Sequence, residues 1–318
     1  MKKLALLLAA LSVASVSYAK EVMPEAAPVV EEPVVVEEPV QEVKAAPVLR
    51  VTSVGQELVV ENTSGNEDVG EAVHLKNMVG LALGDSWTFD LMARKTWNAS
   101  MDDWTDADGV VHGSGMHSKG HRIDLQATRH FDHFTVGAKW RGEKDCDKFY
   151  LPVSYNFGML SGWATPGYAF YDNKNDAYYL EAEPVQLSYG PFQLAYYFEG
   201  EQYTGDDVLG EERLDHWFVH QARLRATLFQ NDDFKVGAEY RYQFDSELDA
   251  KTLADGSESK YSNARHIAIL NAAYNVTENL VLGTYYQYEF NKYDDFENMA
   301  VKDDDYYGEF GLGWTYNF

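Results

Sequence analysis

Several features that define common protein classes are rare in this sequence. Its 318 residues include a single cysteine, Cys146, which excludes a disulfide framework and any zinc or iron–sulfur site built on cysteines. Basic residues are scarce, because 26 Lys and Arg stand against 51 Asp and Glu. Nucleic acid is therefore excluded as a partner, since binding to phosphates needs a basic surface.

Long apolar runs and the local motifs of hydrolases are also missing. After residue 19 no stretch reaches 12 uninterrupted apolar residues, whereas a transmembrane helix needs about 20. No G-x-S-x-G nucleophile elbow occurs, and no acidic loop has the spacing of a calcium-binding loop. We therefore predict that the protein is not an enzyme and carries no cofactor.

Two histidine pairs are candidates for metal ligands or catalytic bases. His130 with His133, and His216 with His220, are close in sequence, but no third ligand converges on either pair, and histidines at strand ends are more often surface residues. Asp215 precedes His216 directly, and neighbours along a strand point to opposite faces. We predict no metal site.

The first 48 residues differ in composition from the rest of the chain. Residues 1–19 begin with Lys2 and Lys3, continue with an apolar stretch and end in Ser-Tyr-Ala, which predicts a secretory signal peptide cleaved after Ala19. Residues 20–48 repeat Val-Val-Glu-Glu-Pro. Regular proline and repeated charge predict an extended Pro/Glu-rich periplasmic tether.

From residue 49 onward, large apolar residues alternate with small or polar ones. This period of two is typical of strands with one face in lipid and the other in water. It is clearest at the C-terminus, where the intervening positions are glycine or polar residues. The apolar positions of this strand, which we predict to act in barrel assembly, are Phe310, Leu312, Trp314, Tyr316 and Phe318.

About fourteen such segments, or about 12 or 16 under other placements, fit between residues 49 and 318. Tight turns such as 85–86 and 190–191 alternate with long polar loops such as 98–117 and 245–260, as in outer-membrane barrels. We predict an all-β fold, a transmembrane antiparallel β-barrel over 49–318. A soluble β-sandwich also has alternating strands, but it does not explain aromatic residues at both ends of the apolar faces.

The two ends of the chain resemble the fusobacterial major outer-membrane porins of the FomA type. The residues concerned are MKKLALLLAALSVASVSYA at 1–19, KEVMPEAAPVVEEPVVVEEPV at 20–40 and GEFGLGWTYNF at 308–318. Between them the resemblance is one of pattern. It implies a general diffusion porin, oligomeric by analogy, whose loops also take part in adhesion. A weaker resemblance, to small monomeric barrels, rests on size.

A barrel of about fourteen strands leaves an aqueous lumen unless loops fill it. Bases at its inward positions gather in 94–141 and 223–241, whereas acids lie on the closing strands. Opposed walls of this kind create a transverse field that makes a channel charge-selective, although such residues also pair simply to form a wet wall. The charged residues that we predict to line the pore are Lys76, Asp90, Arg94, Arg122, Asp124, Lys139, Arg141, Arg223, Arg225, Lys235, Glu239, Arg241, Glu289 and Glu309.

These patterns predict a porin in the outer membrane of a Gram-negative cell, which passes small hydrophilic solutes and ions by passive diffusion. Its partners would be the membrane lipid and the solutes, and association of three barrels is left open. The alternative is an outer-membrane adhesin or structural barrel, whose extracellular loops, such as 98–117, bind host or bacterial partners.

Overall fold

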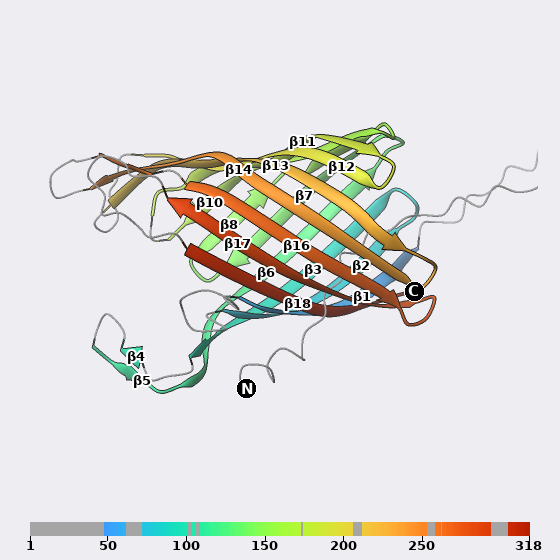
Figure 1. The fold of residues 1–318 in the computed structure, drawn as a ribbon, viewed down its shortest axis with the longest axis horizontal. Helices are drawn as coiled ribbons and strands as arrows, with labels where there is room; N and C mark the ends of the chain where they lie inside the picture. The colour runs from blue at the N-terminus through green and yellow to red at the C-terminus, as the bar shows by residue number, and fades with distance from the viewer. Residues whose placement is uncertain are drawn as a thin grey trace, which may run out of the picture.

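The computed structural model of the protein is a closed β-barrel whose strands run obliquely around it (Figure 1). The predicted signal peptide, with its cleavage after Ala19, and the tether up to residue 47 lie outside the described residues. The structure describes residues 48–61, 72–100, 104–105, 109–172, 174–205, 212–252, 258–261, 263–293 and 305–318.

The described elements are all β-strands. No helix long and apolar enough to cross a membrane occurs in the part of the chain that the structure describes. The strands are β1 (Leu49–Val60), β2 (Val73–Leu83), β3 (Trp87–Ser100), β4 (Trp104–Thr105), β5 (Val111–His112), β6 (Gly115–His130), β7 (Phe134–Glu143), β8 (Cys146–Tyr150), β9 (Val153–Asn156), β10 (Leu160–Tyr171), β11 (Ala177–Tyr189), β12 (Phe192–Tyr203), β13 (Glu212–Gln230), β14 (Phe234–Thr252), β15 (Glu258–Tyr261), β16 (Asn263–Asn275), β17 (Leu280–Tyr293) and β18 (Asp305–Asn317).

The barrel wall has fourteen strand positions. β8 and β9 share one of them, since both pair with β7 and with β10, while β15 only extends the sheet beside β14. The first and last strands close the wall, because β1 pairs antiparallel with β18 from Ser53 opposite Asn317 to Val60 opposite Phe310. The predicted all-β antiparallel barrel of about fourteen strands is confirmed.

The two edges of the barrel differ in their connections. Short turns join the strands at the edge where β1 begins and β18 ends; at one of them Gly190 has a φ of 57°, a left-handed conformation that lets the chain reverse just before Pro191. We call this edge the turn side and the opposite edge the loop side. On the loop side, the β4–β5 hairpin stands away from the wall (Figure 1).

Two of the expected loops are partly strand. β13 and β14 have 19 residues each, so β14 continues to Thr252, well into the segment 245–260 that we expected to be a polar loop. The loop expected at 98–117 contains the β4–β5 hairpin and the ends of β3 and β6. Each further pair of residues in an antiparallel ladder adds hydrogen bonds, and polar side chains do not oppose pairing where strands leave the lipid.

Side-chain burial is reversed relative to a soluble protein. On β7, Phe134 and Val136 point outward and are 51% and 48% exposed, while Lys139 and Arg141 alternate with them on the inner face. Charged and amide side chains are buried inside the barrel, where they contact one another. Buried examples are Asp124, Glu183, Glu201, Gln221, Arg223, Gln243 and Glu289.

Aromatic side chains form two belts on the outer face. On the turn side Phe134 packs against Phe157, with ring centroids 5.6 Å apart, and on the loop side Phe149 packs against Phe170 at 5.9 Å. On the single strand β14, Phe234 lies in the turn-side belt and Phe244 lies in the loop-side belt. Ten residues at about 3.3 Å each, tilted by about 40°, separate the belts by about 25 Å, the height expected of the lipid-facing band.

Candidate functional site

The inner wall carries two clusters of basic side chains. The first lies on β3, β6 and β7, where inward residues of three neighbouring strands stand side by side. At its centre is Asp124, which is 7% exposed and accepts hydrogen bonds from Arg122 Nε at 2.7 Å and Arg122 Nη2 at 2.5 Å. Lys139 Nζ and Arg141 Nε lie 3.1 and 3.2 Å from the same carboxylate.

Basic side chains outnumber acidic side chains in this first basic cluster. Arg94 stands opposite Arg122 in the strand register, and both guanidinium groups approach Glu143, at 4.0 and 3.9 Å. Like charges in register are unfavourable unless a counter-ion lies nearby. The cluster therefore has four bases against the two acids Asp124 and Glu143, and presents positive charge to the lumen.

The second basic cluster lies on β11, β13 and β14 and is built around Glu183. This carboxylate is 1% exposed and forms a bidentate ion pair with Arg225. The Nη2 and Nη1 atoms of Arg225 donate to its two oxygens at 2.5 and 2.9 Å. Arg223 Nη1 donates to Glu183 at 2.8 Å. Paired, hydrogen-bonded geometry of this kind holds the buried carboxylate charged.

Glu239 completes the second basic cluster. Its carboxylate forms ion pairs with Arg241, whose Nε lies 2.7 Å from Oε1, and with Arg225, whose Nε lies 3.2 Å from Oε2. The Arg223 guanidinium also lies over the ring of Tyr197, 3.3 Å from its centroid. Three arginines thus face two carboxylates, and the charge of the cluster is again positive.

A third group, which the sequence analysis did not predict, surrounds Glu201 near the loop side. Tyr171 and Tyr203 each donate a hydrogen bond to it at 2.6 Å, and Trp217 Nε1 donates at 3.0 Å. Lys148, from β8, reaches the same carboxylate at 3.0 Å, although β10 and β11 lie between β8 and β12. The sequence signal was a run of Tyr and Glu in the same alternating phase on β11 and β12.

Acidic residues dominate the strands that close the barrel. Glu309 on β18 accepts a hydrogen bond from Tyr285 of β17, and Glu289 lies 3.4 Å from Arg265. On β1, Glu57 pairs with the predicted pore residue Lys76 at 2.8 Å. The closing strands thus bear the acidic side of the inner wall.

Two of the cavities that adjoin these groups have several charged residues in their linings. The larger of these two, about 750 Å³, lies towards the turn side. It is lined by charged residues of β13, β14 and β18 that include the predicted Lys235. The predicted residue Asp90 is exposed and stands between Gly80 and Gln126 in the register. The polar residues of the larger cavity include Gln193, Arg225, Lys235, Glu239, Arg241, Asn271, Tyr285, Gln287 and Glu309.

The smaller cavity, about 380 Å³, lies on the loop side beside Glu61, His74 and Lys174. His74 is fixed between Thr96, at 2.8 Å, and Glu61, at 2.6 Å. Burial opposes ionisation of Glu61, but the hydrogen bond and charge of His74 outweigh it, so the pKa of Glu61 lies below its usual value. This carboxylate is therefore ionised at neutral pH.

The histidine pairs considered from the sequence have separate partners. His130 Nε2 bonds Thr88 Oγ1 at 2.9 Å, whereas the ring of His133 packs on Phe157 at 5.2 Å. His216 bonds Glu247 at 2.9 Å, and His220 bonds the hydroxyl of Tyr196 at 2.6 Å.

No family model matches the sequence, and no curated protein matches it. Solved structures with similar folds include outer-membrane expressed OmpT of Vibrio cholerae, at 14% identity and a TM-score of 0.45, over 86% of this chain and 99% of that one. A bacterial polysaccharide outer membrane secretin is similar at 11% identity and a TM-score of 0.49, over 84% and 98%. An anion-selective porin from Comamonas acidovorans is similar at 11% identity and a TM-score of 0.40, over 85% and 100%. The resemblance to fusobacterial porins stays a prediction.

Proposed function

We propose that the protein is an outer-membrane porin, a channel for passive diffusion of small hydrophilic solutes and ions. The observation that carries the proposal is the reversed burial: charged side chains gather inside a closed barrel, while large apolar side chains cover its outside between two aromatic belts. An outer face of this kind is stable in lipid and unstable in water. A wall of about fourteen strands is wide enough to leave an aqueous lumen.

The charges support weak selectivity as part of the proposal. In the strand order of the closed barrel, the two basic clusters on β3, β6, β7 and on β13, β14 lie on opposite sides of the wall. The acidic residues on the closing strands, among them Glu289 and Glu309, lie between them. Separate basic and acidic sectors of the wall impose an uneven field on ions that pass through the lumen. We propose the fourteen charged residues predicted from the sequence as the pore lining.

Conductance of a planar bilayer tests the channel. The chain from residue 20 to 318, refolded in detergent and added under a salt gradient, should produce stable ohmic steps, and the reversal potential should report the preferred sign of charge. A correctly folded barrel that never conducts would contradict the proposal and would leave the adhesin reading in its place.

Removing the arginines of the second basic cluster should shift the channel's preference between cations and anions. Replacement of Arg223, Arg225 and Arg241 by Ala should raise the permeability of cations relative to anions. A unit charge about 7 Å from an ion contributes about 0.6 kcal/mol in water, or about threefold in permeability for each arginine. An unchanged reversal potential would show that these three arginines do not contribute to the charge selectivity of the channel.

The β4–β5 hairpin favours a second function beside the first. It projects from the loop side (Figure 1), and projecting loops on a rigid scaffold are common binding elements. Deletion of residues 102–115 should abolish binding to a host or bacterial partner if the protein is an adhesin, while a porin keeps its conductance. The proposal that the protein is a porin also includes its location in the outer membrane and the association of three barrels.

A further inference from the structure

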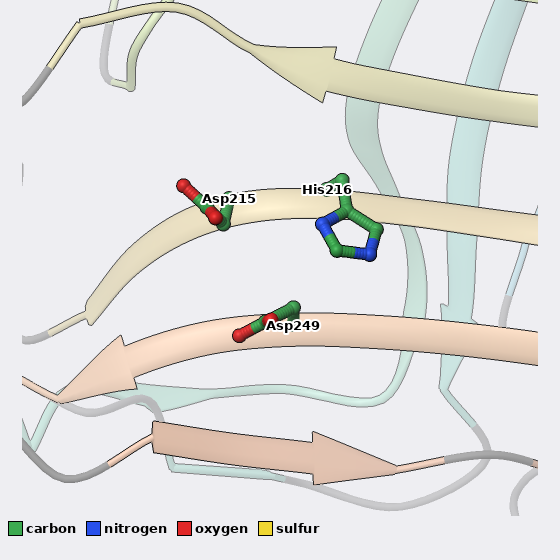
Figure 2. A group of neighbouring side chains, drawn as sticks. All are labelled: Asp215, His216 and Asp249. Carbon is green, nitrogen blue, oxygen red and sulfur yellow. The ribbon is translucent and has the colours of Figure 1, made fainter.

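Three metal-ligating side chains converge where β13 and β14 leave the barrel on the loop side: Asp215, His216 and Asp249 (Figure 2). Each offers one ligand atom, and these atoms all lie within 4.8 Å of one another. Asp249 is 6% exposed, while Asp215 and His216 are half-buried. The group lies beyond the aromatic belt marked by Phe218 and Phe244, outside the lipid band.

The expectation that Asp215 and His216 would point to opposite faces is wrong at this position. The register between β13 and β14 shifts between Leu214 and His216, so Asp215 is the extra residue of a β-bulge. A bulge breaks the strict alternation of side chains and re-aims one of them. His216 stands directly opposite Asp249 in the register, which supplies the third ligand that the sequence did not reveal.

A carboxylate outside the group orients the imidazole. His216 Nε2 lies 2.9 Å from Glu247 Oε1, and the ring stacks on Phe218 with an interplanar angle of 3° and centroids 6.0 Å apart. Figure 2 shows Nδ1 on the side of the ring that faces the two aspartates. In a neutral imidazole that donates Nε2–H to a carboxylate, Nδ1 keeps its lone pair. Carboxylate–histidine–metal arrangements fix ligands in this way.

We propose that Asp215, His216 and Asp249 bind a divalent transition-metal cation of the zinc type. One imidazole nitrogen and two carboxylates are ligands that Zn²⁺ accepts, with bonds of about 2.0–2.2 Å. Ligand atoms within 4.8 Å need only small side-chain rotations to reach that geometry, and the half-exposed side leaves room for water as a fourth ligand. Calcium and magnesium prefer oxygen ligands alone. The bound ion ties β13 to β14 beyond the lipid band, and this site does not depend on the channel function.

Calorimetric titration of ZnCl2 into the untagged chain 20–318 in detergent tests the site with matched variants. Asp249→Asn and His216→Ala should each weaken zinc binding at least tenfold, the loss typical when a metal site loses a ligand or its support. Asp245→Asn is the control, because Asp245 is an exposed acid on the same strand, opposite His220. Equal affinity in all four proteins, or no saturable binding by the wild type, would overturn the proposal.

A second experiment needs no variant. Diethyl pyrocarbonate modifies free imidazole, and trypsin cleavage after Arg213 and Arg223 yields the peptide 214–223, which contains both His216 and the internal control His220. Zn²⁺ present during modification of the folded protein should lower labelling of His216 several-fold and leave His220 unchanged in the mass spectrum. Equal labelling with and without zinc, or equal protection by Ca²⁺, would overturn the assignment.

Discussion

At the scale of single residues, the inner wall depends on carboxylates that each serve several bases. Glu183 shows this best, since it is almost completely buried and holds both Arg223 and Arg225. A buried charge is tolerated only when it is paired and hydrogen-bonded. The same carboxylate lowers the net positive charge of the second basic cluster.

Glu183→Gln should therefore act in the direction opposite to the arginine variants. Loss of one negative charge leaves the cluster more positive, so anion permeability relative to cation permeability should rise about threefold. The reversal potential under a salt gradient measures the change. Glu278→Gln, an exposed turn residue, is the matched control, and equal shifts in both variants would contradict the assigned place of Glu183 on the ion path.

At the scale of elements, neighbouring strands approach closely where glycine faces a large inward side chain. Gly311 on β18 stands beside the ring of Tyr285 on β17, and a methyl group added at Gly311 would overlap that ring. Tyr285 donates a hydrogen bond to Glu309. The glycine thus leaves the space in which this tyrosine reaches its partner.

Gly311→Ala should destabilise the barrel by about 1–3 kcal/mol, the usual cost of overpacking, because Tyr285 must move and lose its bond to Glu309. Urea unfolding in lipid vesicles measures the change. Gly120→Ala on β6 is the control, since a methyl group there meets nothing within 4 Å. A Gly311→Ala midpoint equal to that of Gly120→Ala would show that Tyr285 moves freely.

At the scale of the whole molecule, the outer face divides into two aromatic belts and an aliphatic band between them. On β16 the belts are marked by Tyr274 on the turn side and His266 on the loop side. Leu270 lies midway between them and is 56% exposed. Its neighbour Ile269 points inward and lines the larger cavity.

Leu270→Arg should lower the free energy of unfolding in vesicles by about 2–4 kcal/mol, the cost of placing arginine at the middle of a bilayer on a barrel. Ile269→Arg should cost less, because the new charge enters a polar cavity near Glu239, its partner in the register. If Ile269→Arg destabilised the barrel more than Leu270→Arg, the inner and outer faces would have been assigned the wrong way round.

The sequence by itself determined where the strands of the barrel wall lie and which residues share a face, although not how far strands such as β14 continue into the expected loops. Alternation has a local period of two, so the positions of Phe134 and Lys139 on opposite faces of β7, and the closing strand at 305–317, followed from neighbouring residues alone. The fourteen charged residues predicted as the pore lining came from the same local rule.

Only the tertiary structure decided which side chains meet. Lys148 reaches Glu201 past two strands because the wall curves, and Glu183 reaches Arg225 because β11 and β13 flank β12 with a particular stagger. The bulge before His216 overrides the period of two and joins it to Asp215 and Asp249. Stagger, closure and bulges depend on pairing between segments far apart in the chain, and no local pattern encodes them.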